Sequence, residues 1–199
     1  MESLTYENII NNPNISELQK IQEKKYKEYI DNHKKNVIET WEELKKNKII
    51  YDYILSQSTS KDIIEIIDKN IPNHDNSKYG EEEWEPYRKR FYPVNEEEKR
   101  ASKKEFSKAW DHHKKINSHH HEHWEEINQN DKMPLSDVVE MCCDWISMSK
   151  VFGGTALAWY YKQNNIFLGN KQKEWTLFIL NIFYAFLFLL KFFINYCLK

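Results

Sequence analysis

Apolar side chains recur at helical spacing along most of the chain. The clearest run spans residues 26–44, where they stand at positions i, i+3, i+4 and i+7. Its apolar members are Tyr26, Tyr29, Ile30, Val37, Trp41 and Leu44. This period predicts an amphipathic helix that buries one face. His33 lies in the middle of that face, where a single histidine is more often a hydrogen-bonded core residue than a ligand.

Three shorter helices are predicted further along the chain. Ser60 is the expected cap of a helix whose core side is formed by isoleucines at positions 63, 64, 66 and 67. A second helix begins after Pro134 and ends at the glycine pair of positions 153 and 154. The third covers Ala156–Gln163.

A longer helix is predicted from Lys104 to Trp124. Its inward positions are Phe106, Trp110, His113, Asn117, His120 and Trp124, at offsets 0, 4, 7, 11, 14 and 18. Burying the polar members unpaired would cost about 1–3 kcal/mol each, and a metal ion with its water shell would satisfy them. The alternative is a His-rich surface tract, the better interpretation of His112, His121 and His123, which point off this face. His119 fits either interpretation.

The segment Thr176–Leu198 is almost entirely apolar. Its 23 residues, at about 1.5 Å per residue, are enough to cross a hydrocarbon layer of roughly 30 Å. Lys191 could extend toward an interface, with Trp175 and Tyr196 near the two boundaries. A membrane anchor is the favoured interpretation, because a soluble helix normally keeps a polar face. The alternative is a helix buried in the bundle or in a dimer interface.

The composition agrees with a helical fold. The 199 residues include only 4 glycines and 5 prolines, few for the many turns of a β-sandwich or barrel. We therefore expect an all-α protein in three parts. These are a polar N-terminal arm over residues 1–20, a helical domain over 21–174 and a hydrophobic C-terminal helix over 175–199.

Charge and motifs exclude several classes of function. The net charge of −2 gives no basic footprint for nucleic acid, and no glycine-rich phosphate loop is present. Three cysteines form neither a disulfide framework nor a CxxC site. The opening MESLTYENIINN lacks the basic start and apolar run of a signal peptide. We expect an intracellular, cytoplasmic domain, with a tail anchor in a membrane as its possible attachment.

The candidate ligands follow a recognisable order along the chain. They are His33, His74-Asp75, His113, His119-His120 and Asp144. This order resembles the HD superfamily of metal-dependent phosphohydrolases, whose all-helical fold carries the pattern H…HD…D and, in its two-metal members, additional histidines. The HD pair of that superfamily is often followed three residues later by lysine, and Lys78 stands there. The resemblance implies an HD-like helical bundle.

The chain also resembles an uncharacterised family of small bacterial and phage proteins. The shared blocks are HDxSK…E…PY…FYP, AWxxHxxxNxHHxxxW and EMxCDWxxM, which here lie within residues 74–93, 109–124 and 140–148. The similarity extends over about residues 26–169 and leaves out the apolar tail. The chain departs from both patterns at Pro72, which distorts the helix before the HD pair, and at the extra His121 and His123.

The resemblance implies a ligand set for one or two ions. The primary ion would be held by His33, His74, Asp75 and Asp144, with Asp75 able to bridge to a second ion. The second ion, or a phosphate, would be held by His113 together with His119 or His120. Imidazole and carboxylate ligands suit Mn, Fe or Zn, and a site lined by oxygen suits Mg.

The resemblance also implies roles in catalysis. Lys78 would stabilise charge on a phosphoryl group, Asn117 would orient a ligand or a substrate oxygen, and Glu140 would act as a base behind the ligands. Asp75, Lys78 and Glu140 are therefore the expected catalytic residues.

Three functions are compatible with the sequence. The favoured one is a metal-dependent phosphohydrolase that takes a nucleotide or another small phosphate ester. A non-catalytic metal-binding helical protein is one alternative. The other is an interaction module tethered to a membrane through Thr176–Leu198, whose histidines form a hydrogen-bonded core.

Overall fold

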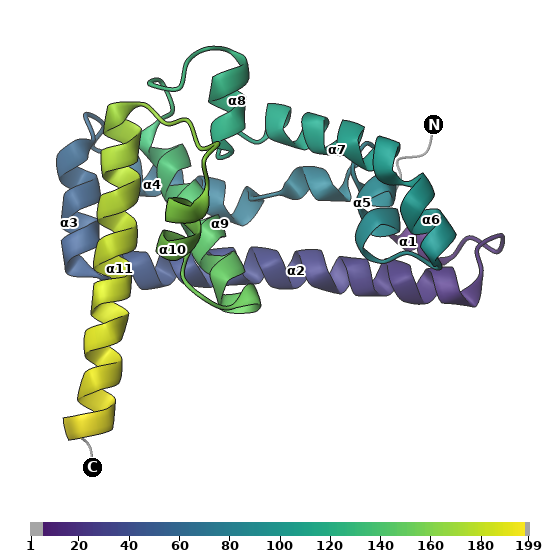
Figure 1. The fold of residues 1–199 in the computed structure, drawn as a ribbon, viewed down its shortest axis with the longest axis horizontal. Coiled ribbons are helices and arrows are strands. Elements are labelled where there is room, and N and C mark those ends of the chain that lie inside the picture. The colour runs from purple at the N-terminus through teal and green to yellow at the C-terminus, as the bar shows by residue number, and fades with distance from the viewer. Residues whose placement is uncertain (1–5, 198–199) are drawn as a thin grey trace. The chain divides into compact units, whose positions relative to one another are not determined.

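A computed structural model describes the backbone of residues 6–197 and the side chains of residues 6–190. Every regular element within this range is a helix, which confirms the all-α prediction (Figure 1). The chain forms two compact units. Unit 1 consists of Met1–Lys35 and Asp75–Asn117, and unit 2 of Asn36–His74 and Ser118–Lys199.

The longest of the described helices, α2 (Glu17–Lys46), contributes to both units. Its buried positions include Tyr26, Ile30, His33, Val37, Trp41 and Leu44. These positions are the apolar face expected from the sequence, together with the histidine in its middle. The helical period therefore identified the buried face of α2 correctly.

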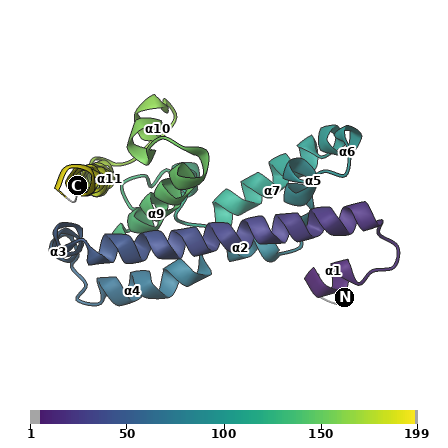
Figure 2. The same cartoon turned by 90° about the horizontal axis from the view of Figure 1, so that it is seen from below.

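Unit 1 is built on the first part of α2. Its other elements are α1 (Tyr6–Ile10), the 3₁₀ helix η2 (Asn76–Tyr79), α5 (Trp84–Phe91), α6 (Glu96–Ala101) and α7 (Lys103–Ile116). Figure 2 shows α5, α6 and α7 grouped together. The core of the unit consists of Tyr26, Ile30, Trp84, Tyr87 and Ala109.

An arginine lies inside unit 1. Arg88 is fully buried, with its Nε 3.0 Å from Oε1 of Glu23. Its two terminal nitrogens donate to the carboxylate of Glu98 at 2.7 and 3.0 Å. The indole of Trp84 donates to the other Glu23 oxygen at 2.6 Å. These charge-assisted bonds offset the cost of removing the guanidinium and the Glu23 carboxylate from water.

Unit 2 packs around helix α9. Its elements are the second part of α2, α3 (Lys48–Gln57), α4 (Ile63–Asn70), the 3₁₀ helix η1 (Ile71–Asn73), α8 (His121–Glu126), α9 (Leu135–Phe152), α10 (Ala156–Lys162) and α11 (Asn170–Cys197). α9 packs against α4, α10 and α11, and α11 also packs against α3, as Figure 1 shows. Two successive glycines, Gly153 and Gly154, end α9 with φ of 83° each.

The prediction of one helix from residue 104 to residue 124 is wrong. α7 ends at Ile116, Asn117 is extended with φ −105° and ψ 98°, and α8 begins only at His121. The amide side chain of Asn117 donates to the carbonyl of His113 at 2.9 Å and so satisfies the end of α7. The break resets the helical phase, and His121, expected on the surface, is buried.

The start of α4 also differs from the expectation. Ser60 is not the cap, because Asp62 occupies that position and the hydroxyl of Ser60 accepts from the Asp62 amide. Ile63 and Ile67 are buried, whereas Ile66 is exposed. Helix α3 (Lys48–Gln57), which begins after Asn47, was not predicted from the sequence.

Helix α11 joins the core along its first half. Gln172 donates to the carbonyls of Asp131 and Met133 at 2.9 and 3.0 Å, and Ile179 and Leu180 are fully buried. Residues Asn170–Leu190 are long and apolar enough to cross a membrane. Trp175, however, is buried in the core instead of marking a membrane boundary. The expectations for the side chains of Lys191 and Tyr196, and for residue 198, lie outside the described residues.

Replacing Arg88 by methionine is expected to lower the free energy of unfolding by about 3–5 kcal/mol, because the buried Glu23 carboxylate loses its partner. Arg90→Met is the matched control. The Arg90 guanidinium lies 5.9 Å from the ring centre of Phe106 and forms no part of the buried ion pairs. Its loss should cost about 1 kcal/mol or less. Urea unfolding followed by circular dichroism measures both, and equal losses would contradict a stabilising role of the pairs.

Two leucines of α11 test the division of the helix into a packed and an exposed part. Leu180 is fully buried and Leu189 is 63% exposed. Leu180→Ala should therefore lower the free energy of unfolding by about 2–5 kcal/mol, whereas Leu189→Ala should change it by about 0.5 kcal/mol or less. Denaturant unfolding in detergent solution compares the two variants. Equal sensitivity at both positions would show that the packed region does not end where we place it.

Candidate functional site

The site in unit 1 is organised by Asp75. This residue has a left-handed backbone, with φ 54° and ψ 22°, a conformation that aspartate tolerates better than most residues other than glycine. The turn leads directly into η2. Lys78 then lies three residues on, with its ammonium 2.6 Å from Oδ2 of Asp75.

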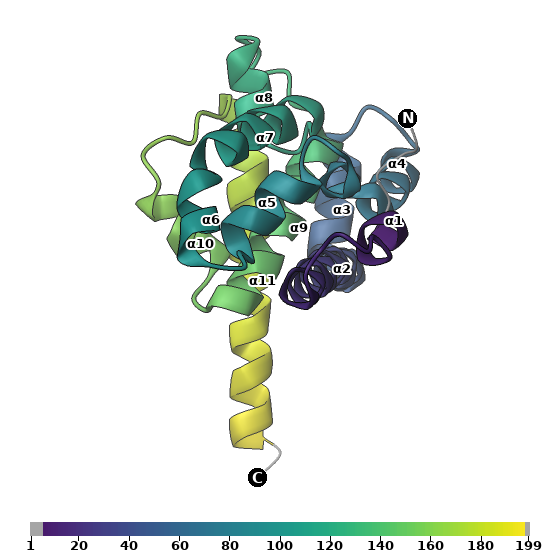
Figure 3. The same cartoon turned by 90° about the vertical axis from the view of Figure 1, so that its right-hand side faces the viewer.

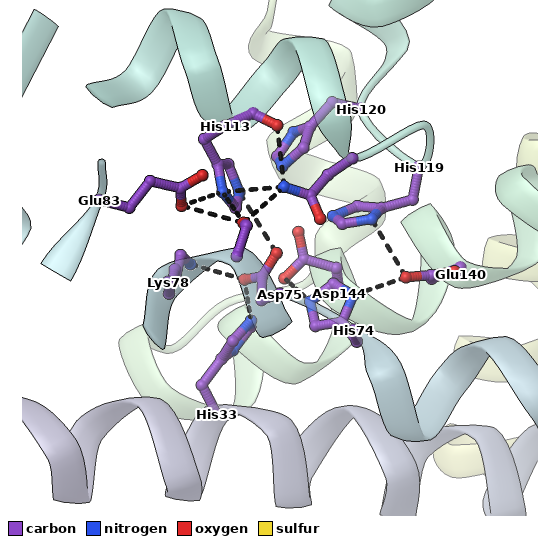
Figure 4. A network of polar contacts seen from close by, with 12 residues as sticks. His33, His74, Asp75, Lys78, Glu83, His113, His119, His120, Glu140 and Asp144 are labelled. Atoms are coloured by element: carbon purple, nitrogen blue, oxygen red, sulfur yellow. Dashed lines mark hydrogen bonds and ion pairs between the residues drawn. The ribbon is translucent and has the colours of Figure 1, made fainter. Parts of the chain in front are cut away.

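Two histidines contact the Asp75 carboxylate from other elements of unit 1. Nε2 of His33, on α2, lies 3.3 Å from Oδ2, and Nε2 of His113, on α7, lies 3.2 Å from Oδ1 (Figure 4). All three side chains are buried. The structure therefore brings together three of the residues predicted to bind metal, and each imidazole directs Nε2 toward the carboxylate.

His113 is held from its other side by Glu83. This fully buried glutamate has Oε2 2.8 Å from Nδ1 of His113, and it accepts from the Ser77 hydroxyl at 3.0 Å. Its other oxygen lies 2.9 Å from Nδ1 of His112. Burial alone would lower the pKa of His113, but its hydrogen bonds to Asp75 and Glu83 outweigh burial and raise that pKa. A carboxylate behind each ring nitrogen fixes the orientation of the imidazole.

Asn117 supports the same group. Its amide nitrogen donates to the Ser77 hydroxyl at 2.8 Å. The contributions of Glu83, Ser77 and His112 were not predicted from the sequence. A signal for two of them was present, because the shared block HDxSK…E contains both a serine and a glutamate to which no role was given.

The site in unit 2 is organised by Glu140 of α9. One of its oxygens, Oε1, lies 2.9 Å from Nδ1 of His74 and 3.1 Å from Nδ1 of His119 (Figure 4). The two rings lie 4.3 Å apart between centroids. His74 directly follows η1, the short 3₁₀ helix that contains Pro72, so the chain is distorted before this histidine as expected.

This arrangement determines which nitrogen each ring can offer to an ion. Because Glu140 engages Nδ1 of both histidines, Nε2 is the ring atom that is directed to a ligand. Oδ1 of Asp144, one turn further along α9, lies 3.9 Å from Nε2 of His74. Two ligands that each stand about 2.0–2.2 Å from one ion can have such a separation.

The charge of Glu140 suits a residue that accepts hydrogen bonds from two imidazoles. Burial would raise its pKa, but the hydrogen bonds from His119 and His74 outweigh burial and lower that pKa to about 2. The carboxylate is therefore ionised at neutral pH. One ligand atom from each of His74, His119 and Glu140 lies within 4.8 Å of the other two, so this buried set could itself hold a metal ion with Glu140 as a ligand; in the arrangement described above, Glu140 stands behind the two imidazoles instead. The nitrogen and oxygen donors of this set suit Mn, Fe or Zn.

The remaining histidines take different places in unit 2. The ring of His120 lies 4.4 Å from that of His119, and its Nδ1 lies 4.0 Å from Glu122. Nε2 of His121 lies 3.4 Å from the same carboxylate, and His123 packs against Trp124. Of the pair 119 and 120, it is therefore His119 that contacts Glu140.

The predicted site residues thus form two groups. Unit 1 brings together His33, Asp75, Lys78, His113 and Asn117, and unit 2 brings together His74, His119, Glu140 and Asp144. The boundary between the units falls on the peptide bond between His74 and Asp75. That all these residues serve one centre stays a prediction.

The unit 2 group can be tested by metal binding. His119→Ala should remove bound Mn, Fe or Zn, and Glu140→Gln should weaken binding by about 10–100-fold because it orients both rings. His123→Ala is the control and should keep full binding, since His123 packs against Trp124. Titration of the metal-depleted chain with each ion measures the affinities. Equal weakening in the three variants would indicate nonspecific binding by the histidine-rich segment.

Comparison with known proteins places the chain in a family. No curated protein and no solved structure matches it. A family model matches residues 22–182, which is more than half of the chain and includes every predicted site residue from His33 to Asp144. The match also includes α11 from Asn170 to Ile182. The chain belongs to the family described as "Family of unknown function (DUF5662)".

Proposed function

We propose that the protein is a metal-dependent phosphohydrolase that acts on a nucleotide or another phosphate ester. The observation that carries the proposal is the contact of one Glu140 oxygen with Nδ1 of both His74 and His119. Carboxylates that orient imidazoles from behind are a recurring feature of protein metal sites, because they fix both the tautomer and the ring plane.

The proposed ion would be held by His74 and His119 through Nε2 and by Asp144 through its carboxylate. This donor set is the chemistry that Mn, Fe and Zn prefer. The resemblance to the HD superfamily adds His33 and Asp75 as further ligands. His74 and Asp75 are consecutive residues, so these two proposed ligands are neighbours along the chain.

A divalent ion held by these residues would supply Lewis-acid chemistry, which activates water at neutral pH. The residues of unit 1 suit the other half of the reaction, the binding of a phosphoryl group. The Lys78 ammonium stands 2.6 Å from Asp75, with its side chain only 12% exposed. A positive charge in such a partly dehydrated place stabilises phosphoryl oxygens better than one in bulk water.

Asn117 and His113 are proposed to assist the reaction by holding groups of unit 1 in a fixed orientation. Asn117 holds the Ser77 hydroxyl, which in turn donates to Glu83. Glu83 fixes the ring of His113 beside Asp75. In the proposed enzyme this chain of hydrogen bonds keeps His113 oriented toward a second ion or a phosphate.

A non-catalytic metal-binding protein is the second candidate. The observation that favours it is burial, because His74 and His119 are almost inaccessible to solvent. A structural ion contributes directly to folding, whereas a catalytic ion must also admit a substrate.

The enzymatic proposal predicts phosphate release by the metal-loaded full chain. Inorganic phosphate would be measured with nucleoside mono- and triphosphates and p-nitrophenyl phosphate, in Mn²⁺, Fe²⁺, Zn²⁺ or Mg²⁺. Asp75→Asn should reduce kcat by about 100-fold or more, as removal of a group acting in the transition state does. Lys78→Met should chiefly lower kcat/KM, and Lys103→Met, in the first turn of α7, is the matched control that should keep full activity.

The outcome that would contradict the enzyme is specific. If no substrate releases phosphate with any ion, and a chelator lowers the Tm of the wild-type chain but not that of His119→Ala, the ion is structural. If the chelator changes neither phosphate release nor Tm, no metal is involved.

A further inference from the structure

The surroundings of α11 change after Phe183, beyond which only Tyr184 and Leu187 of the described side chains still pack against the core. Up to Phe183 the helix is part of the unit 2 core, and Phe183 itself is 3% exposed. Beyond it, Phe186, Phe188, Leu189 and Leu190 are exposed by 51%, 70%, 63% and 44%. Figure 3 shows these last turns extending past the end of α9.

The exposed part of α11 presents a broad apolar face. Successive residues of a helix point about 100° apart, so the exposed positions 185, 186, 188, 189 and 190 span an arc of about 200°, while Tyr184 and Leu187 on the remaining side pack against the unit 2 core. The apolar stripe that a helix buries against one partner is typically about 100° wide or somewhat more, so a second copy or a protein partner would leave part of this face in water. A bilayer contacts the whole of such a face.

Neighbouring segments of unit 2 extend this apolar surface. A groove beside α11 is lined by Thr155, Tyr184, Leu187 and Phe188, so the turn after α9 adjoins the exposed helix. Phe152, directly before that turn, is 73% exposed. Exposed Trp159 and Tyr161 follow on α10. Tryptophan and tyrosine are enriched where protein meets the membrane interface.

The family match gives an independent boundary. It ends at residue 182, one residue before the last fully packed position of α11. The packed residues of α11 up to Ile182 therefore belong to the shared domain, and the exposed positions between 185 and 190 lie beyond it.

We propose that the exposed face of α11 inserts into a lipid bilayer from Ala185 onward, with Phe152 at the membrane surface, while Asn170–Phe183, together with Tyr184 and Leu187, remains packed on the protein. This differs from an anchor beginning at Thr176, because the first two turns of that anchor are consumed by packing. The ligand is the hydrocarbon of the bilayer, and the proposal is independent of the proposed catalysis.

Flotation with vesicles tests the insertion. The full chain, purified in detergent, is mixed with vesicles of phosphatidylcholine and phosphatidylglycerol, the detergent is removed, and the vesicles are floated on a density gradient. The wild-type chain should float with the vesicles. The double variant Phe188→Glu, Leu189→Glu should reduce the floating fraction at least about tenfold, because charges are costly in hydrocarbon.

A matched control separates insertion from general stickiness. Ile21 and Ile49 are 50% and 60% exposed on α2 and α3, so Ile21→Glu, Ile49→Glu removes equally exposed apolar groups elsewhere. This variant should float like the wild-type chain, and all three proteins should share one Tm. The proposal is overturned if both double variants lose flotation equally. It is also overturned if the wild-type chain stays with the soluble fractions, either as a monomer or as a dimer that Phe188→Glu, Leu189→Glu dissociates.

Discussion

The pairing of buried charge is the constraint on which both units depend. An ionised carboxylate inside a helical core is tolerated only when donors surround it, because the low dielectric makes an unpaired charge very costly. In unit 2 the carboxylate of Glu140 receives two imidazoles, which tie the end of η1 and the segment between α7 and α8 to α9. In unit 1 the arrangement is reversed, because the carboxylates of Glu23 and Glu98 both pair with the guanidinium of Arg88. The polar side chains thus determine where irregular segments attach to apolar helices.

The three charged clusters are of two kinds, which differ in the chemistry that they offer. The Arg88 cluster pairs cations with carboxylates and leaves no ligand chemistry, so it is a structural feature. The Glu140 and Asp75 clusters instead combine imidazoles with carboxylates. Glu140 contacts Nδ1 of His74 and so orients its Nε2, whereas Nε2 of His33 and of His113 is directed at the Asp75 carboxylate. Such pre-oriented imidazoles are costly to bury for stability alone. This difference is why the metal-dependent function is proposed for one set of buried groups and not for the other.

Helix α11 combines two environments in one element. Its first half is held by Gln172 and by apolar packing against α9 and α3, whereas positions 185, 186 and 188–190 are exposed although the sequence there is just as apolar. The hydrophobicity of the sequence alone therefore predicts one environment for the whole apolar segment, although only part of it packs in the core. In the proposed insertion, lipid surrounds the exposed residues of α11. The packed residues of the same helix then determine the position of the domain relative to the membrane surface.

The sequence by itself determined the helical class, the inward face of α2, the start of α9 and most residues of the candidate site. These features follow from local period and motif, which act over a few turns. The tertiary structure alone decided the break at Asn117, the role of Glu83 and the division of α11 at Phe183. Each depends on a contact that the sequence pattern does not reveal. Helix α7 ends where the Asn117 side chain donates to the carbonyl of His113, and Glu83 bonds a histidine thirty residues away. The core covers only part of the apolar helix α11. Local hydrophobicity shows which residues avoid water, but long-range contacts decide what replaces the water.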